Sequence, residues 1–572
     1  MTLLAHAGAA PIELQLRPGM LPLPQPAAPP LTAGVPDADR QPDFGLALEP
    51  DQPARWVFAP GRRIDISVRA SADPGRDRVV LTAWDWENRP VAETLFALPV
   101  ADAVRLRVEG RGTYVLTLDA MQGHAPVARL VRSVAVCPSN VDRRARWRQS
   151  DFWVGQCSFP GWQNARLEGG RPAHSEALTE DEARQLDAEL VARMGVQVAR
   201  INFPVIRRDT EGLDLDFALA DRCVEAFVSR GLELDLQLLA PYGDGPGPLL
   251  PRYLDLPLTQ SALYPLRENA YRRYVREAVA RYGRHARFFQ IGNEPTNAHQ
   301  YGGTPEEYVA SARQAVDEIR ARFPDAAVTN GGYCFASEAT VEVARGLCGL
   351  TDFVSYHWHG GLEGLGAFLP QIAEVQRAAG CGEVRYANTE MGLAMPTVAH
   401  ERAHAVAEMQ KALYCWAHGH LGVLFYSSRE LWWPRQFAYS GISDYGFVDH
   451  FFCPRSAYGA ASAFLAWYAG CRFMRVLEES AELHAYEFAR GEERLIALFA
   501  GQGPQQVTLA TDARRTTLID PMGNESRPVE GREVALTVGE YPQTVRLFGA
   551  TYARVATAAP PAIDEPAEVP ER

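Results

Sequence analysis

The sequence predicts an α/β protein built around a (β/α)8 TIM barrel, with one β-sandwich before the barrel and another after it. Between about residues 151 and 428, short apolar runs alternate with stretches of helical periodicity. The segments on either side contain short runs in which apolar and polar residues alternate, separated by Gly, Pro or Asp. A chain of 572 residues is long enough for roughly two to four domains, so three folded parts fit its length.

The composition is that of an ordinary globular protein and argues against two classes of partner. Hydrophobic residues make up 47% of the chain and charged residues 22%. The formal net charge of −13 disfavours binding to nucleic acid or to an anionic membrane. No apolar run reaches the roughly 18 residues that a membrane-spanning helix needs.

The N-terminus and the cysteines predict a cytoplasmic protein. The first residues, MTLLAHAGAAPIELQ, lack the basic and apolar regions of a secretory signal. The nine Cys residues are scattered, odd in number and without a Cys-x-x-Cys pair. We therefore expect reduced, mostly buried thiols.

The first part of the chain is predicted to be an arm followed by a β-sandwich. Residues 1–43 form the arm, because residues 17–43 are rich in Pro. Residues 44–147 form the sandwich, because stretches such as RIDISVRA, RVVLTAWDW and TYVLTLDA are typical of antiparallel strands.

Residues 148–468 are predicted to form the barrel, with a helix or a long loop after each of eight strands. The helix after Thr304 opens with Thr-Pro-Glu-Glu, which combines an N-cap, Pro at the first helical position and acidic residues in the first turn. An open doubly wound sheet fits less well, because no Gly-rich phosphate-binding loop follows the first strand. The predicted strands are FWVGQCSF (152–159), QVARINFP (197–204), LELDLQLLA (232–240), RFFQIGNE (287–294), AAVTNGG (326–332), DFVSYHWH (352–359), EVRYANTE (383–390) and GVLFYSS (422–428).

The last part of the chain is predicted to be a second β-sandwich and a tail. Residues 469–552 contain short alternating runs such as RLIALFAG, QQVTLAT and EVALTV. The tail, residues 553–572, ends in a Pro- and Ala-rich stretch without core-forming residues and is predicted to be disordered.

Polar and aromatic side chains gather where the predicted barrel strands end. In a (β/α)8 barrel the functional residues lie at the carboxyl ends of the strands, so we expect these side chains to converge there. The aromatic residues in the loop after the eighth strand are candidates for contact with a substrate ring. The candidate site residues are Arg200, Asn293, Glu294, His357, His359, Glu390, Tyr426, Trp432 and Trp433.

Two of these residues, Glu294 and Glu390, form the pair of carboxyl groups that glycoside hydrolysis requires. In a retaining enzyme one protonates the leaving oxygen and the other attacks the anomeric carbon. Arg200 beside Glu390 would keep that nucleophile ionised. We expect Glu294 to stay protonated, through burial and the negative charge nearby. Asn293 has donors that could hold a sugar hydroxyl.

These residues resemble a known family. Asn-Glu-Pro at the end of the fourth strand, a Glu on the seventh, Arg in ARINFP and the run YHWH on the sixth look like clan A of the glycoside hydrolases, with families 39 and 5 closest in style. The resemblance covers about residues 150–468 and includes the segment DYGFVDHFFCPRSAYGAASAFL (444–465).

The resemblance implies a retaining (β/α)8 enzyme in which Glu294 is the acid/base, Glu390 the nucleophile and Asn293 the residue that binds the 2-hydroxyl. It also implies that Arg200 is the partner of the nucleophile and that His357 lines the mouth of the barrel. Departures from the clan pattern lie at Gly292, at the His-Trp-His of the sixth strand, and at Tyr426, Trp432 and Trp433, which must serve where a Trp often ends the eighth strand. These departures affect the prediction of which substrate is bound more than the prediction of which reaction is catalysed.

The sequence thus predicts a β-glycosidase that acts on an oligo- or polysaccharide without a metal or an organic cofactor. One alternative is a barrel that binds carbohydrate without turning it over. Another is a metal-dependent hydrolase, since His357-x-His359 on a strand can bind zinc, although no third ligand is evident. The linkage, the sugar and the oligomeric state are not readable from the residues.

Overall fold

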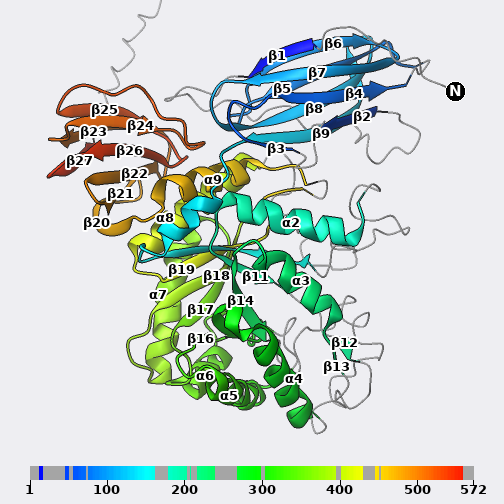
Figure 1. Ribbon diagram of the computed structural model, residues 1–572. Coiled ribbons are helices and arrows are strands. Elements are labelled where there is room, and N and C mark those ends of the chain that lie inside the picture. Colours follow the sequence, from blue (N-terminus) through cyan, green and yellow to red (C-terminus); the bar gives the residue numbers. More distant parts are fainter. Residues whose placement is uncertain are drawn as a thin grey trace, which may run out of the picture. The chain divides into compact units, whose positions relative to one another are not determined.

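Figure 1 shows the protein as a computed structural model. The chain divides into two compact units, whose main parts are residues 25–470 and residues 471–572. The first holds the barrel and the N-terminal sheets, and the second holds the C-terminal sheets. The predicted limits of the individual domains stay predictions. The structure describes residues 12–16, 46–50, 56–71, 75–160, 178–201, 206–207, 215–238, 267–297, 303–394, 401–429, 445–449 and 452–557.

Eight parallel strands form a barrel, which confirms the predicted fold class. Neighbouring strands pair in the order β16-β15-β14-β11-β10-β19-β18-β17. Isolated parallel bridges from Thr329 to Phe353 and from Tyr333 to Tyr356 join the two ends of this sheet and close it. Each predicted strand overlaps one of them. The strands are β10 (Trp153–Ser158), β11 (Val198–Ile201), β14 (Glu233–Leu238), β15 (Ala286–Ile291), β16 (Val328–Thr329), β17 (Val354–His359), β18 (Tyr386–Gly392) and β19 (Gly422–Phe425).

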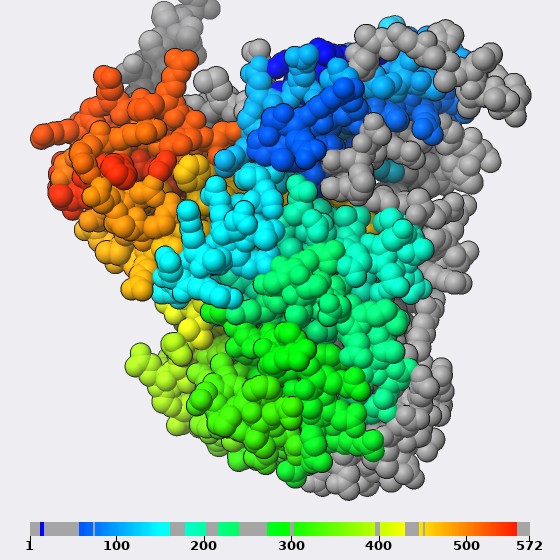
Figure 2. Space-filling model, in the orientation of Figure 1, coloured from blue at the N-terminus to red at the C-terminus, as the bar shows by residue number. Residues whose placement is uncertain are grey.

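A helix follows each barrel strand and covers the outside of the sheet (Figure 1). In the view of Figure 2, side chains of α3, α4 and α5, in teal and green, lie on the outer surface. Thr304 caps α5 in a reciprocal pair of hydrogen bonds with Glu307, so this helix begins at Pro305 as its sequence predicts. The helices are α2 (Glu180–Met194), α3 (Ala218–Val228), α4 (Arg267–Tyr282), α5 (Pro305–Arg322), α6 (Glu338–Leu347), α7 (Leu362–Ala379), α8 (Glu401–Ala417) and α9 (Ser456–Tyr468). A short pair, β12 (Ile206–Arg207) and β13 (Leu215–Asp216), lies between β11 and α3.

The inside of the barrel is apolar at one end and polar at the other. Trp153, Phe288 and Phe353 meet at the end where the strands begin, with ring centroids 5.2 Å and 5.4 Å apart. Further along the barrel strands the inward side chains become charged or polar, as at Arg200 of β11. The aromatic residues therefore fill the bottom of the barrel, and the carboxyl end is left for chemistry.

Two sheets precede the barrel. They are ordered β1-β7-β4-β2 and β3-β9-β8-β5-β6 and share one apolar core. Strand β1 lies within residues 1–43, which the sequence assigned to an arm. It pairs in parallel with β7 and buries Leu14 and Leu16, so its short apolar alternation supplies part of the core. The strands are β1 (Ile12–Leu16), β2 (Leu46–Pro50), β3 (Val57–Phe58), β4 (Ile64–Ala70), β5 (Arg78–Trp84), β6 (Pro90–Ala97), β7 (Val100–Val108), β8 (Gly112–Gln122) and β9 (Ala125–Val136).

The connection from these sheets to the barrel is anchored by its buried residues Asn140 and Trp147. It contains η2 (Val141–Arg143) and α1 (Arg144–Trp147). Asn140 donates from Nδ2 to the carbonyl oxygens of Met194, at 2.9 Å, and Ser462, at 2.8 Å. These contacts hold α2 and α9 against the connecting segment.

The second unit is a pair of antiparallel sheets, ordered β20-β21-β22-β26-β24 and β25-β23-β27. Strand β27 falls within residues 553–572, which the sequence assigned to a disordered tail. It pairs with β23, and Ala553 and Val555 pack against the core of this unit, so backbone pairing orders a segment with little apolar surface of its own. The strands are β20 (Arg472–Glu479), β21 (Leu483–Arg490), β22 (Glu493–Ala500), β23 (Gln505–Thr511), β24 (Arg515–Ile519), β25 (Glu533–Val538), β26 (Gln543–Phe548) and β27 (Ala553–Thr557).

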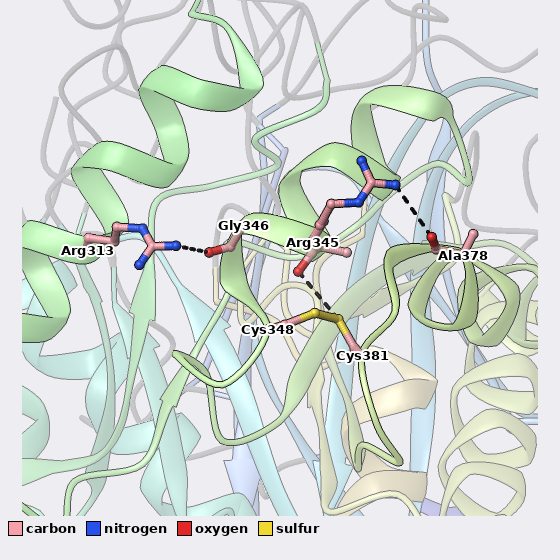
Figure 3. The surroundings of a disulfide bond; sticks show 7 residues. Arg313, Arg345, Gly346, Cys348, Ala378 and Cys381 are labelled. Carbon is pink, nitrogen blue, oxygen red and sulfur yellow. Dashed lines mark hydrogen bonds between the residues drawn. A yellow bond between two sulfur atoms is a disulfide. The ribbon is translucent and has the colours of Figure 1, made fainter.

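A disulfide joins Cys348 and Cys381, so the prediction of reduced thiols is wrong for these two residues (Figure 3). Cys348 follows α6 and Cys381 follows α7, with Cα atoms 5.4 Å apart. The same region carries hydrogen bonds from Arg313 to the carbonyl oxygen of Gly346, at 3.0 Å, and from Arg345 to that of Ala378, at 3.5 Å. These links tie α5, α6 and α7 together at the end of the barrel opposite the strand termini that carry the candidate site.

The disulfide bears on the predicted location. Disulfides persist mainly in oxidising compartments, so this bond removes one of the two reasons for expecting a cytoplasmic protein. The location stays a prediction. Within the described ranges, no helix combines the length and the apolar character needed to cross a lipid bilayer.

Replacing both cysteines of the disulfide with Ser (C348S/C381S) should lower the free energy of unfolding by about 2–4 kcal/mol, because the bond closes a loop in the unfolded chain. Urea unfolding of the two proteins under non-reducing conditions measures the difference. Equal stability of the two proteins would show that this bond does not constrain the unfolded chain.

Candidate active site

Seven of the nine predicted site residues are described, and all seven lie together at the carboxyl end of the barrel. Arg200 lies on β11, His357 and His359 on β17, and Glu390 on β18, while Asn293 and Glu294 follow β15 and Tyr426 follows β19. Each apolar strand interior fixes its register by burial, and this delivers the polar end residues to one place. Trp432 and Trp433 lie outside the described residues.

Arg200 and Glu390 form a buried ion pair at the centre of the site. Nη1 of Arg200 is 2.7 Å from Oε1 of Glu390, and it also donates to the carbonyl oxygen of Thr389 at 3.0 Å. Burial by itself would raise the pKa of Glu390. The positive charges of His357 and Arg200 and a hydrogen bond from His359 outweigh it and hold that pKa well below its usual range. Glu390 is therefore an ionised carboxylate at the end of β18.

Glu294 stands in an unusual backbone conformation, with a φ of 43°. This left-handed conformation is uncommon for a residue with a side chain, and residues held in it cluster at active sites and switch regions. The amide of Glu294 donates to the carbonyl oxygen of Gly331 at 2.8 Å, which anchors the turn after β15 against the segment after β16. The side chain is buried, and Oε2 accepts a hydrogen bond from Asn297 at 2.7 Å.

His357 links the two carboxyl groups. Its Nδ1 lies 2.8 Å from Oε1 of Glu294 and 3.6 Å from Oε2 of Glu390. Gly332, with a φ of +90°, permits this arrangement, because a Cβ atom at that position would lie 2.1 Å from Nε2 of His357. Any larger residue there would displace the histidine from the site.

The expectation that Glu294 stays protonated through burial is wrong for this arrangement. Burial raises the pKa of Glu294 and is the largest single influence. However, the hydrogen bond and the positive charge of His357 together outweigh it, so the pKa lies below its usual value. The sequence does not predict this, because it gives no sign that the histidine of β17 points at the residue after β15.

The two carboxyl groups are close enough to act on one bond. A carboxylate oxygen of Glu294, one of Glu390 and a ring nitrogen of His359 all lie within 4.8 Å of one another. Retaining glycosidases hold their two carboxyl groups about 5–5.5 Å apart, whereas inverting enzymes need about 6.5–9.5 Å to admit a water molecule. The pair of oxygens within 4.8 Å is therefore closer than the spacing that inverting enzymes need.

His359, Tyr426 and Tyr445 form an aromatic wall beside Glu390. Nε2 of His359 lies 3.2 Å from Oε2 of Glu390, and its ring centroid is 4.9 Å from that of Tyr426 and 5.1 Å from that of Tyr445. Burial raises the pKa of Tyr445, and so do the charges of Glu390 and Glu294. Sequence reasoning missed Tyr445, because it lies in the long connection between β19 and α9 and not at a strand end.

Asn293 is oriented by its carbonyl oxygen. Oδ1 accepts hydrogen bonds from Arg200, at 2.6 Å, and from Gln237, at 3.1 Å. Because both donors approach the oxygen, the amide NH2 group is directed away from them. This is the orientation that an asparagine needs to donate to a substrate hydroxyl.

Asp235 on β14 is a buried carboxyl group that sequence reasoning missed. Its side chain is 4.0 Å from Nε of Arg200, and no hydrogen-bond partner from the described part of the chain reaches either of its oxygens. Burial raises its pKa to about 7, because the opposing charge of Arg200 only partly compensates and the charge of Glu390 adds to the rise. The run Leu-Asp-Leu-Gln-Leu (234–238) carries the signal, since Asp235 and Gln237 share one face of an otherwise apolar strand.

The end of β18 is supported from behind by buried charges on α8. Lys411 donates to the carbonyl oxygen of Gly392 at 2.7 Å and to Glu408 at 2.9 Å. Gly392 is paired with His359 in the sheet, and a Cβ there would lie 2.8 Å from Nδ1 of that histidine. Lys411 thus fixes the backbone at the end of β18, the strand that carries Glu390.

Two sets of side chains in the site have the spacing of metal ligands. Glu294 belongs to both, with Cys334 and His357 in one set and with His359 and Glu390 in the other. His357 and His359 fall into different sets, so the zinc-binding pair that the sequence left open is not the grouping found among the described residues.

Comparison with known proteins supports the fold. No protein-family model matches this sequence, and no curated protein matches it. Among solved structures, the chain is similar to a family 39 glycoside hydrolase from the gut symbiont Bacteroides cellulosilyticus WH2, with 16% sequence identity, a TM-score of 0.61, and coverage of 88% of this chain and 100% of that one.

Two further structures share less. A monomeric β-xylosidase from Caulobacter crescentus CB15 is 14% identical, with a TM-score of 0.46 and coverage of 72% and 97%. A family 30 endoxylanase from Clostridium papyrosolvens C71 is 11% identical, with a TM-score of 0.44 and coverage of 69% and 96%. The similarity to the Bacteroides protein shows that this chain has the fold of a family 39 glycoside hydrolase.

Replacing Asp235 with Asn should change how stability depends on pH. The folded state raises the pKa of Asp235 to about 7, so the stabilisation that this group gives in its protonated form is present below about pH 4 and is lost as the pH rises through 7. The native protein should therefore lose about 2–4 kcal/mol relative to D235N over that range. Urea unfolding of both proteins at several pH values measures this, and a constant difference would contradict it.

Proposed function

We propose that the protein is a retaining glycoside hydrolase that cleaves β-glycosidic bonds of an oligo- or polysaccharide by double displacement. The observation that carries this proposal is the pair of carboxyl groups, Glu294 and Glu390, with oxygens within 4.8 Å of each other and with Arg200 paired to Glu390. The fold shared with a family 39 glycoside hydrolase supports it.

Glu390 is the nucleophile. The charges of His357 and Arg200 and the hydrogen bond from His359 keep it ionised. In the first step this carboxylate attacks the anomeric carbon while Glu294 gives its proton to the leaving oxygen, and the glycosidic bond breaks. A covalent glycosyl ester on Glu390 results.

Glu294 is the acid and then the base. After the leaving group departs, its carboxylate takes a proton from water, and the water oxygen attacks the anomeric carbon and releases Glu390. The hydrogen bond from His357 favours the carboxylate form that this second step needs. Asn293, directed by Arg200 and Gln237, binds the 2-hydroxyl of the sugar that forms the ester.

Replacing Glu294 with Ala should slow substrates with poor leaving groups by about 10²- to 10⁴-fold, because bond cleavage then lacks an acid. Substrates with activated aryl leaving groups should keep a fast first step and accumulate the ester, since they need no proton. Rapid-quench kinetics with both substrate types measures the difference, and E390Q, which lacks the nucleophile, serves as the matched control without a burst. An equal loss on both substrate types would argue against an acid role for Glu294.

The value of kcat/KM should be highest at acidic pH and fall as the pH approaches neutrality, because free enzyme must hold a proton on Glu294 and the pKa of that group is lowered. The limb that reports ionisation of Glu390 lies at still lower pH, since its pKa is held well below its usual range. The variant H357L removes the donor that lowers the pKa of Glu294, so the alkaline limb should move to higher pH. Initial rates across the acidic and neutral range, with circular dichroism to check folding, test this. A limb that stays in place or moves to lower pH would count against the assignment.

A further inference from the structure

The segment that follows β16 lies directly against the proposed acid/base. The hydroxyl of Tyr308 donates to the carbonyl oxygen of Ile291 at 2.7 Å and accepts from the amide of Gly331 at 3.0 Å, so the ends of β15 and β16 are fixed side by side. The Cys334 thiol interacts with Glu294, and a ligand atom of each lies within 4.8 Å of the other. Residues 331–334 therefore line the Glu294 side of the site.

Phe335 is the next residue, and its backbone is anchored on the same side. The hydroxyl of Thr340, in the first turn of α6, donates to the carbonyl oxygen of Phe335 at 2.8 Å and lies 3.3 Å from the hydroxyl of Thr296. Thr296 is two residues beyond Glu294. This hydrogen-bonded chain holds the backbone of Phe335 next to the turn that carries the acid/base.

Phe335 is 52% exposed, and it follows a run of buried or half-buried residues, 331–334, on the Glu294 side of the site. Among the residues described between positions 144 and 470, it is the one large hydrophobic side chain that is exposed. A single exposed apolar side chain is ordinary on a protein surface. Here, however, the aromatic ring belongs to a residue whose backbone is anchored at the carboxyl end of the barrel, beside the turn that carries Glu294.

We propose that Phe335 is the platform on which the leaving-group side of the substrate stacks, through the apolar face of a sugar ring. This inference rests on the proposed function, because that function assigns the leaving group to the Glu294 side of the site and the sugar that forms the ester to the Glu390 side. The acid/base gives its proton to the leaving oxygen, so groups around Glu294 contact the departing part of the substrate. The wall of His359, Tyr426 and Tyr445 adjoins Glu390 and contacts the sugar that forms the ester.

This placement separates the two steps of the reaction. A ring that stacks only on the departing sugar stabilises the first transition state and any acceptor sugar that attacks the ester in place of water. It makes no contact during hydrolysis of the ester, because the site on that side then holds water alone. Removing the ring should therefore affect cleavage of sugar–sugar bonds and transfer to sugar acceptors, but not hydrolysis of a glycosyl fluoride.

The test compares the full chain with F335A on three reactions. The variant should lose about tenfold in kcat/KM on an oligosaccharide and a similar factor in the ratio of transfer to hydrolysis with an added sugar acceptor, while kcat/KM on the matching glycosyl fluoride stays within twofold. F335W should restore the first two values. F548A, which removes another exposed aromatic side chain in the second unit, is the matched control and should leave all three reactions unchanged.

The outcomes separate the two proposals. Unchanged oligosaccharide cleavage and transfer in F335A would overturn the role of Phe335 while leaving the glycosidase intact. An equal loss on the oligosaccharide and the fluoride would also overturn it, since that pattern indicates damage to the whole site. A loss of kcat/KM with an aryl glycoside but none with an oligosaccharide would show that Phe335 stacks on an aromatic leaving group, and it would contradict stacking on a sugar ring. No turnover of any glycoside by the unaltered chain would instead reject the proposed function.

Discussion

The buried ion pair between Arg200 and Glu390 is the interaction on which the rest of the site depends. Neither charge is tolerable alone inside a barrel, and breaking such a pair by removing one partner typically costs about 3–5 kcal/mol. Arg200 also donates to Asn293 and to the backbone of β18, so one guanidinium group orients three parts of the site. The apolar base of the barrel, where Trp153, Phe288 and Phe353 pack, keeps these charges at the carboxyl end.

The charge balance around this pair assigns different states to the carboxyl groups. Asp235 lies further from Arg200 than Glu390 does and lacks hydrogen bonds within the described residues, so burial favours its protonated form up to about pH 7. Glu390 pairs with the guanidinium group of Arg200 and remains ionised. Glu294 lies 2.8 Å from His357, and this histidine also lies 3.6 Å from Glu390, so one ring lowers the pKa of both carboxyl groups. Arg200 pairs with Glu390 alone of these two, and such unequal surroundings separate the pKa values of neighbouring carboxyl groups.

Much of the fold and of the site can be predicted from the sequence, because both depend on local patterns. The apolar runs that end in Arg200, Glu294, His357 and Glu390 specify buried parallel strands, and the barrel then brings their ends together. The features that the sequence does not predict are those that depend on contacts between residues far apart in the chain. The Cys348–Cys381 bond depends on the packing of α6 against α7, and the lowered pKa of Glu294 depends on the direction of His357. Likewise β1 and β27 are ordered by pairing with partners far along the chain, and Tyr445 reaches the site from a long connection.

The central claim is that Glu390 attacks the anomeric carbon, and trapping of the covalent ester tests it most directly. In a 2-deoxy-2-fluoro glycoside, the fluorine slows both formation and hydrolysis of the ester. An activated leaving group makes formation fast again, so the ester accumulates. Intact-protein mass spectrometry with peptide mapping, across a panel of such β-glycosides, should find one sugar per chain attached to Glu390. The sugar that labels fastest would identify the residue bound beside the nucleophile. A label on Glu294 or elsewhere, or no label from any sugar on a chain that hydrolyses the parent glycoside, would contradict the account.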